Sequence, residues 1–94
     1  MLMAISFDPA KSDRNRRERG LPFEAAALFD FETAIVRQDS RLDYGEPRYQ
    51  ALGLLGDMIC LLVFTPTADG LRVISLRKAS RKERKAWLAS RTPI

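Results

Sequence analysis

The residues best suited to chemistry in this sequence form one basic stretch near its C-terminus. Residues 71–76 have the apolar pattern of a β-strand and pass without a loop into a helix-forming run. Arg77 and Lys78 stand at this passage. The cations that follow them are Arg81, Lys82, Arg84 and Lys85. Because arginine pairs its planar fork with two phosphate oxygens, cations on a strand end and the adjoining helix start predict a site that holds a phosphate group.

Charge is distributed unevenly along the chain. Residues 77–94 carry seven Lys or Arg against Glu83 alone, a net charge of +6, and residues 11–19 carry +3. Residues 20–76 have a net charge of −4. Such asymmetry favours a polyanionic partner, because clustered cations gain affinity when they release counterions from a phosphate backbone. A solvated helix surface is the alternative interpretation.

The sequence contains no histidine and a single cysteine, Cys60. Histidine acid–base pairs, histidine-dependent nucleophilic triads and zinc sites of the usual kind are therefore excluded. Chemistry must rely on Lys, Arg, Asp, Glu, Tyr or backbone groups, and we expect neither a metal site nor a cofactor. Cys60 lies inside an apolar run, so we expect an inert core thiol.

Caps and breakers predict three helices that would position these residues. Asp8 followed by Pro9 starts the first helix, and Gly20 ends it. This helix is polar on nearly every face, so we expect it on the surface. A second, short helix opens at residues 22–24. Ser80 and the glutamate three residues later form a capping box, so the last helix starts at Ser80 and ends before residue 92.

Between the helices we expect a meander of about four strands, preceded by a short N-terminal strand. Gly56-Asp57 and Asp69-Gly70 are typical of tight hairpin turns, and residues 38–47 form a polar loop. The expected strands are residues 34–36, 48–55, 58–64 and 71–76. Residues 58–64 are all apolar, as expected of a strand covered on both faces. We therefore predict an α+β fold, an antiparallel sheet flanked by two N-terminal helices and one C-terminal helix.

Length and composition predict one globular domain over residues 1–94. A chain of 94 residues buries only about 60 to 65% of its unfolded surface, so it would gain stability from a partner. The hydrophobic content of 46% is that of a globular protein. No apolar run approaches the ~20 residues that span a membrane, and no secretory signal is visible. We expect a cytoplasmic protein without membrane association, translated from Met1 or Met3.

Strings along nearly the whole chain resemble the BrnT family of toxins from bacterial type II toxin–antitoxin pairs. The matching strings are Ile-Ser-Phe-Asp-Pro-Ala-Lys at residues 5–11, Phe-Glu-Ala-Ala at 23–26, Leu-Phe-Asp at 28–30, Asp-Tyr-Gly-Glu-Pro-Arg at 43–48, Ala-Leu-Gly at 51–53 and Arg-Val-Ile-Ser-Leu-Arg-Lys-Ala-Ser-Arg-Lys-Glu-Arg at 72–84. Two positions depart from the family pattern. Glu18-Arg19-Gly20 stands where Lys-His-Gly is usual, and Trp87 replaces a tyrosine.

The resemblance implies a RelE-like fold and a metal-independent endoribonuclease that inhibits translation by cutting RNA. The ribose 2′-hydroxyl would be the nucleophile, so the protein must orient it, stabilise a phosphorane-like transition state and assist proton transfer. Arginines suit the second task. The implied partner is a BrnA-like antitoxin with a ribbon-helix-helix segment, in a heterotetramer or larger complex that binds promoter DNA only through the antitoxin. A non-catalytic basic module that docks an acidic antitoxin or nucleic acid is the alternative.

The catalytic candidates at the strand–helix passage each have an alternative role. Arg77 is expected to have an anchored root and a free head, which favours catalysis or phosphate binding over a salt bridge with a loop acid. Arg81 lies in the first turn of the last helix, where a cation opposes the helix dipole, so function explains it better than stability. Lys78 is a further candidate. Arg72 has the opposite strand parity from Arg77, so the two point to opposite faces unless a bulge intervenes.

Further candidates lie where the loop enters the meander. Glu46 is the candidate general base, with a structural carboxylate as the alternative, and Arg48 is a candidate catalytic cation. Tyr44 and Trp87 could stack on bases, but packing against the sheet is the preferred interpretation for Trp87. The residues expected to bind RNA are Arg72, Lys82, Arg41 and Tyr44.

Overall fold

The helix boundaries follow from local capping chemistry. The computed structural model describes residues 3–91. Helix α1 (Pro9–Arg19) begins where an Asp8 carboxylate oxygen accepts a hydrogen bond from Ala10 N (2.9 Å), and it ends at Gly20, whose φ is 73°. Helix α2 (Arg81–Ser90) begins at the capping box of Ser80 and Glu83. The predicted caps of both helices are confirmed. The second predicted helix is a six-residue 3-10 helix, η1 (Phe23–Leu28).

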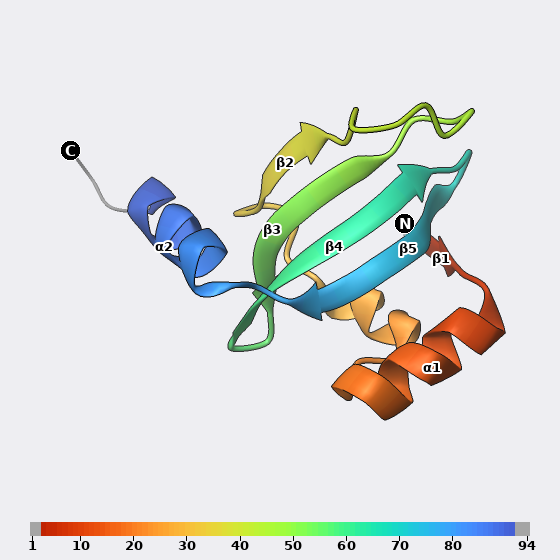
Figure 1. The fold of residues 1–94 in the computed structure, drawn as a ribbon, viewed down its shortest axis with the longest axis horizontal. Coiled ribbons are helices and arrows are strands. Elements are labelled where there is room, and N and C mark those ends of the chain that lie inside the picture. The colour runs from red at the N-terminus through yellow and green to blue at the C-terminus, as the bar shows by residue number, and fades with distance from the viewer. Residues whose placement is uncertain (1–2, 92–94) are drawn as a thin grey trace.

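Five strands form one sheet in the order β1-β5-β4-β3-β2 (Figure 1). Their bounds are β1 (Ala4–Ser6), β2 (Ile35–Gln38), β3 (Tyr49–Leu55), β4 (Met58–Pro66) and β5 (Gly70–Lys78). The last four form the expected antiparallel meander, whereas β1 lies parallel to β5, with Ile5 beside Leu71. The fold class α+β holds, but the prediction of a wholly antiparallel sheet is wrong. A three-residue strand carries no local signal for direction, and its pairing is decided by the path of the chain through α1 and η1.

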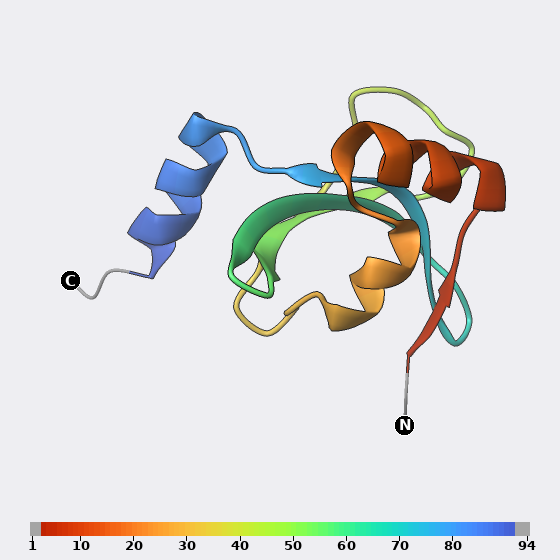
Figure 2. The same ribbon diagram turned by 90° about the horizontal axis from the view of Figure 1, so that it is seen from below.

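Strand β4 is buried on both of its faces, as the unbroken apolar run predicted. Cys60 and Leu62 belong to the core cluster that α1 and η1 cover. Leu61 and Val63 point to the opposite face, where they form a second cluster with Trp87 of α2. The two clusters follow from the alternation of side chains along a strand. Figure 2 shows α1 and η1 on one side of the molecule and α2 standing at the far end.

Helix α1 docks on the sheet through polar side chains. Asn15 Nδ2 donates to the carbonyl oxygens of Leu21 (2.6 Å) and Leu76 (2.8 Å), which ties the helix to the next turn and to β5. Ser12 Oγ accepts from Phe23 N at 2.9 Å. Most of α1 is exposed as predicted, but Ser12 and Asn15 are buried. These two residues are the exceptions because they satisfy main-chain groups that the apolar core cannot.

A bulge in β5 changes which face its arginines occupy. Val63 of β4 pairs with Ser75 and Phe64 pairs with Val73, so Ile74 is an extra residue. Arg72 and Arg77 therefore pair with Thr65 and Leu61, which lie four residues apart on β4 and share a face. The sequence predicted opposite faces for these two arginines unless a bulge intervened, and this bulge places them on one face.

No helix within residues 3–91 is long and apolar enough to cross a membrane.

Candidate functional site

The face of the sheet that α2 covers only at one end carries a polar groove of about 500 Å³. We call it the open-face groove. Alternate residues of β2 to β5 reach it because side chains of one parity share a face. Its lining comprises Arg37, Asp39, Arg41, Arg48, Gln50, Leu61, Val63, Ile74, Ser75, Arg77 and Glu83. Four arginines from separate segments thus meet over one surface.

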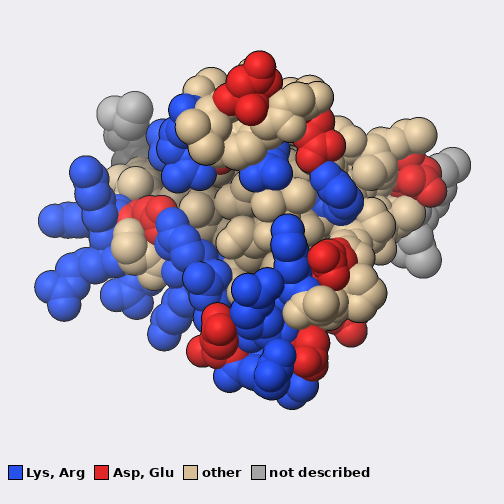
Figure 3. Space-filling view, turned by 45° about the vertical axis from the view of Figure 1, so that its right-hand side comes forward, with Lys and Arg blue, Asp and Glu red and all other residues tan. Residues whose placement is uncertain are grey.

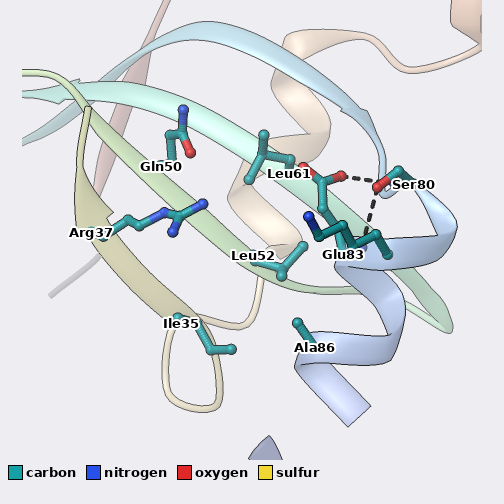
Figure 4. Close-up of a pocket in the computed structure, with 9 residues that line it drawn as sticks. Ile35, Arg37, Gln50, Leu52, Leu61, Ser80, Glu83 and Ala86 are labelled. Atoms are coloured by element: carbon teal, nitrogen blue, oxygen red, sulfur yellow. Dashed lines mark hydrogen bonds between the residues drawn. The ribbon is translucent and has the colours of Figure 1, made fainter. Parts of the chain in front are cut away.

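A second hollow of about 470 Å³, the α2 groove, continues from the first between the sheet and α2 (Figure 4). Its apolar lining is Ile35, Leu52, Leu61 and Ala86, and its polar lining is Arg37, Gln50, Ser80, Lys82 and Glu83. Figure 4 shows Arg37 extending from β2 into the space between the sheet and α2. The two grooves share lining residues and form one continuous depression.

Arg77 is held in the open-face groove by Glu83. Its Nη1 and Nη2 donate to the two carboxylate oxygens of Glu83 at 2.8 and 2.9 Å. The same carboxylate accepts from Ser80 N (2.8 Å), so one acid caps α2 and fixes the arginine. Its bonds to Arg77 lower the pKa of Glu83 to about 2 and raise the pKa of Arg77. The capping role of Glu83 is confirmed, whereas the expected free head of Arg77 is wrong, because the third residue of α2 lies over the strand end.

A buried aspartate orients Arg41 on the groove wall. The Asp39 side chain is 1% exposed, and its two carboxylate oxygens accept from Arg41 Nε (2.8 Å) and Nη2 (2.7 Å). These hydrogen bonds hold the pKa of Asp39 well below its usual range and raise that of Arg41. The Arg41 side chain is nevertheless 71% exposed. Its direction is therefore set while most of its surface is open to a ligand.

Arg48 completes the basic lining next to Tyr44. The Arg48 Cζ lies 3.9 Å from the centre of the Tyr44 ring, a cation–π contact that covers one face of that ring. Arg48 Nε is buried and has no hydrogen-bond partner within residues 3–91. A buried donor without an acceptor costs about 1–3 kcal/mol, so this N–H is a strong candidate to donate a hydrogen bond to an oxygen of a bound anion.

Glu46 and Arg72 form an ion pair outside the open-face groove. Arg72 Nη2 donates to Glu46 Oε1 at 2.5 Å, and both side chains are more than one-third exposed. Neither residue lines either groove. Glu46 is therefore paired with a cation, which is the arrangement expected if it is a structural carboxylate and not the general base.

The remaining predicted site residues are spread over other surfaces. Lys78 lines a different hollow with Arg84. It pairs with Cys60, whereas Arg77 pairs with Leu61, so the two residues lie on opposite faces of β5. Arg81 is exposed in the first turn of α2 and lines neither groove, whereas Lys82 lines the α2 groove. Trp87 is buried, and its Nε1 donates to Thr33 O at 3.1 Å, which confirms its packing role.

Sequence reasoning missed four polar residues of the open-face groove: Arg37, Asp39, Gln50 and Ser75. The sequence did contain a signal for Gln50. It is a polar residue two positions before Leu52 in a mostly apolar strand, so the two side chains point to the same face of the sheet. Arg37 follows Ile35 at the same spacing in β2. Ser75 reaches this groove only through the bulge, for which the sequence had no signal.

Without histidine, a metal site in this chain would have to be built from Asp, Glu and Cys side chains. Within the described part of the chain, no three His, Cys, Asp or Glu side chains gather as a metal site requires. Cys60 is buried and unpaired, and burial raises the pKa of its thiol, as expected of an inert core residue.

Basic side chains dominate the surface that Figure 3 presents. They gather at the left, where α2 lies in Figure 1, and along the lower edge, where α1 lies, with acidic side chains interspersed.

Comparison with known proteins identifies one family. The family model described as the ribonuclease toxin BrnT of type II toxin–antitoxin systems matches residues 7–83 of the 94-residue chain. No curated protein and no solved structure matches the sequence. The matched segment contains every residue that lines the open-face groove. The chain therefore belongs to the BrnT family of ribonuclease toxins of type II toxin–antitoxin systems.

Proposed function

We propose that this chain is a metal-independent endoribonuclease of RelE-like fold that cuts RNA in the cytoplasm and so inhibits translation. The observation that carries the proposal is the meeting of Arg37, Arg41, Arg48 and Arg77 over one groove. Two of these arginines are held by two-point contacts to carboxylates, which keeps them aimed without a ligand. Membership of a ribonuclease toxin family supports RNA as the ligand.

In the proposed reaction, the ribose 2′-oxygen attacks the adjacent phosphorus and the 5′-oxygen of the next nucleotide leaves. The products are a 2′,3′-cyclic phosphate end and a 5′-hydroxyl end. Negative charge grows on the non-bridging oxygens, and fixed arginine forks stabilise that charge without reorganising. A guanidinium has five N–H donors, of which Arg77 uses three on Glu83 and on Lys78 O, leaving two for phosphate.

The two carboxylates of the open-face groove are poorly suited to accept the proton of the 2′-hydroxyl. Asp39 and Glu83 both have lowered pKa values, so neither is a strong base near neutral pH. We keep Glu46 as the proposed general base. Because Glu46 lies outside the open-face groove and is paired with Arg72, this role requires bound RNA to displace Arg72 and to bring the 2′-hydroxyl to the edge of the groove. Lys78, Arg81, Arg72 and Lys82 are proposed to contact RNA that extends beyond the groove.

The experiment that tests this proposal is cleavage of RNA by the purified chain in excess EDTA. Activity should persist, and the products should end in 2′,3′-cyclic phosphate or 3′-phosphate, because the nucleophile belongs to the substrate. Loss of cleavage on chelation, or 3′-hydroxyl ends, would contradict the mechanism. A chain that binds RNA but never cuts it would support the non-catalytic alternative.

Membership of a type II system also implies a cognate antitoxin. We propose a ribbon-helix-helix antitoxin, in a heterotetramer or larger complex, that lays acidic and apolar residues into the α2 groove. That groove fits such a segment because its lining combines the cations Arg37 and Lys82 with the apolar side chains of Ile35 and Leu52. At a thousandfold excess over Kd, a partner that binds only the folded state adds about 4 kcal/mol of stability.

Co-expression tests the antitoxin proposal. It should relieve growth arrest and raise the melting temperature of the toxin, and only the complex should bind promoter DNA. Specific promoter binding by the toxin alone would contradict it.

A further inference from the structure

Helix α1 has two basic sides with different surroundings. On one side, Arg16 and Arg17 both pair with Asp13, at 2.7 and 3.1 Å. On the other side, Lys11 and Arg14 are exposed, and their side chains form no hydrogen bond or ion pair within residues 3–91. They lie three residues apart, about 4.5 Å along the helix axis. Two cations on this side are therefore available to an outside anion.

This unpaired side of α1 is continuous with the open-face groove. A shallow hollow of about 270 Å³ lies along it, lined by Lys11, Arg14, Asn15, Glu18, Arg19, Phe23, Ile74 and Ser75. Ile74 and Ser75 also line the open-face groove. The continuity arises because β1 pairs only with residues 70–72 of β5, so α1 lies along the rest of that strand, anchored by Asn15 on Leu76 O. The bulged residues of β5 thus join two basic surfaces.

We propose that Lys11 and Arg14, the α1 ridge, form a second RNA-binding surface for the phosphate backbone of nucleotides that flank the cleaved bond. The inference rests on the proposed function, because it extends the path of RNA out of the open-face groove. In Figure 3 basic side chains continue along the lower edge of the molecule, where α1 lies. RNA reaching this edge would meet the ridge after leaving the groove.

The chemistry of the ridge fits a nucleic-acid backbone better than a protein. Protein interfaces set their anchor residues, most often Trp, Tyr or Arg, among large apolar side chains that exclude water. α1 exposes none; the exposed large apolar side chains of the described chain lie on other segments: Met3, Leu28, Ile35, Val36, Leu42, Met58 and Leu88. Backbone binding needs only cations that release counterions. Arg16 and Arg17 offer less, since Asp13 already neutralises part of their charge.

The chain offers a matched pair of variants for the test. Lys11→Gln with Arg14→Gln removes two charges from the ridge, and Arg16→Gln with Arg17→Gln removes two from the other side of the same helix. Binding is measured by fluorescence anisotropy against salt, with a labelled, 2′-O-methylated RNA of about 20 nucleotides that cannot be cut. Two lost phosphate contacts on a single strand should reduce the salt slope by about 1.4 in the ridge variant. The control should change it much less.

A short RNA separates the ridge from the groove. The ridge variant should cut an oligonucleotide of about four nucleotides, with native 2′-hydroxyls, at the wild-type rate, because such a substrate fills only the groove. Lys11→Arg with Arg14→Lys should restore the salt slope, which excludes a folding defect as its cause. One result would be a wild type that binds RNA with a steeper salt slope than the ridge variant and yet never cuts RNA. That result would overturn the proposed function but would support the ridge as an RNA-binding surface.

Two results would overturn the ridge itself. One is an equal salt slope for the ridge variant and its control, with cleavage of RNA intact. The other is an unchanged slope together with weakened antitoxin binding, which would make the ridge a protein-binding surface.

Discussion

The two faces of the sheet use polar residues in opposite ways. On the face that α1 and η1 cover, Asn15 and Ser12 are buried and hydrogen-bond to main-chain groups that the apolar core cannot satisfy. On the face that α2 covers at one end, arginines are aimed by carboxylates but keep exposed surface or unused donors. Both faces bury apolar residues of β4. Polar groups on the face that helices cover fully stabilise the fold, whereas those on the partly covered face remain available to a ligand.

The largest expected effect concerns the open face. Arg77→Ala should reduce RNA cleavage by a factor of about 10²–10³, the usual cost of losing one donor that stabilises transition-state charge. Arg84→Ala is the matched control, because Arg84 lines a different hollow. Rates would be measured on folded proteins with equal melting temperatures. A fully active Arg77→Ala protein would remove this residue from the site.

Arg48→Ala should cause a loss of the same order, because Arg48 brings a buried, unpaired Nε to the groove. Arg81→Ala should lose less, since Arg81 lines neither groove. Comparing single-turnover rates of the two variants ranks the residues. If Arg81→Ala proves the more damaging, the reacting phosphate lies at the start of α2 and not in the groove.

On the covered face, the expected change is in stability. Asn15→Ala leaves the carbonyls of Leu21 and Leu76 without their donor, so the free energy of unfolding should fall by about 1–3 kcal/mol. Arg14→Ala, one residue away and exposed, should change it by less than about 0.5 kcal/mol. Urea denaturation measures both. Equal stability of the two variants would show that polar docking of α1 is not what holds this face.

A smaller effect separates the two roles of Glu83. Glu83→Gln keeps an acceptor for the capping box but removes the charge that holds Arg77, whereas Ser80→Ala removes the cap acceptor and leaves the ion pair. We expect Glu83→Gln to lower the cleavage rate, by less than Arg77→Ala, and Ser80→Ala to lower mainly stability. The opposite assignment of the two defects would show that Glu83 acts only as a cap.

The smallest effect is a pH dependence of stability. Folding lowers the pKa of Glu83 from 4.5 to about 2, so its contribution to stability is fully present above pH 4.5 and is lost as the pH falls towards 2. The stability difference between wild type and Glu83→Gln should therefore shrink across that window. Denaturation curves at several pH values measure it, and a difference that is constant from pH 6 to pH 2 would contradict the ion pair.

Elements whose signals are local could be predicted from the sequence. The caps at Asp8 and Ser80 and the buried strand β4 each depend on residues that are close together in the chain. Family membership was also accessible, because the matching strings are contiguous. For the site, Arg41, Arg48 and Arg77 were candidates from the sequence and line the open-face groove, but their assembly into one groove was not foreseen.

By itself, then, the sequence determined the helix ends, the two-sided burial of β4, the lack of histidine chemistry and the excess of basic charge. Only the tertiary structure decided that β1 runs parallel to β5, that a bulge brings Arg72 and Arg77 to one face, and that Arg37 and Gln50 join the groove. The physical reason is the distance along the chain over which each interaction acts. Caps and periodicity act within a few residues, whereas strand direction, bulges and groove lining depend on contacts between segments far apart in the chain, whose geometry no local pattern encodes.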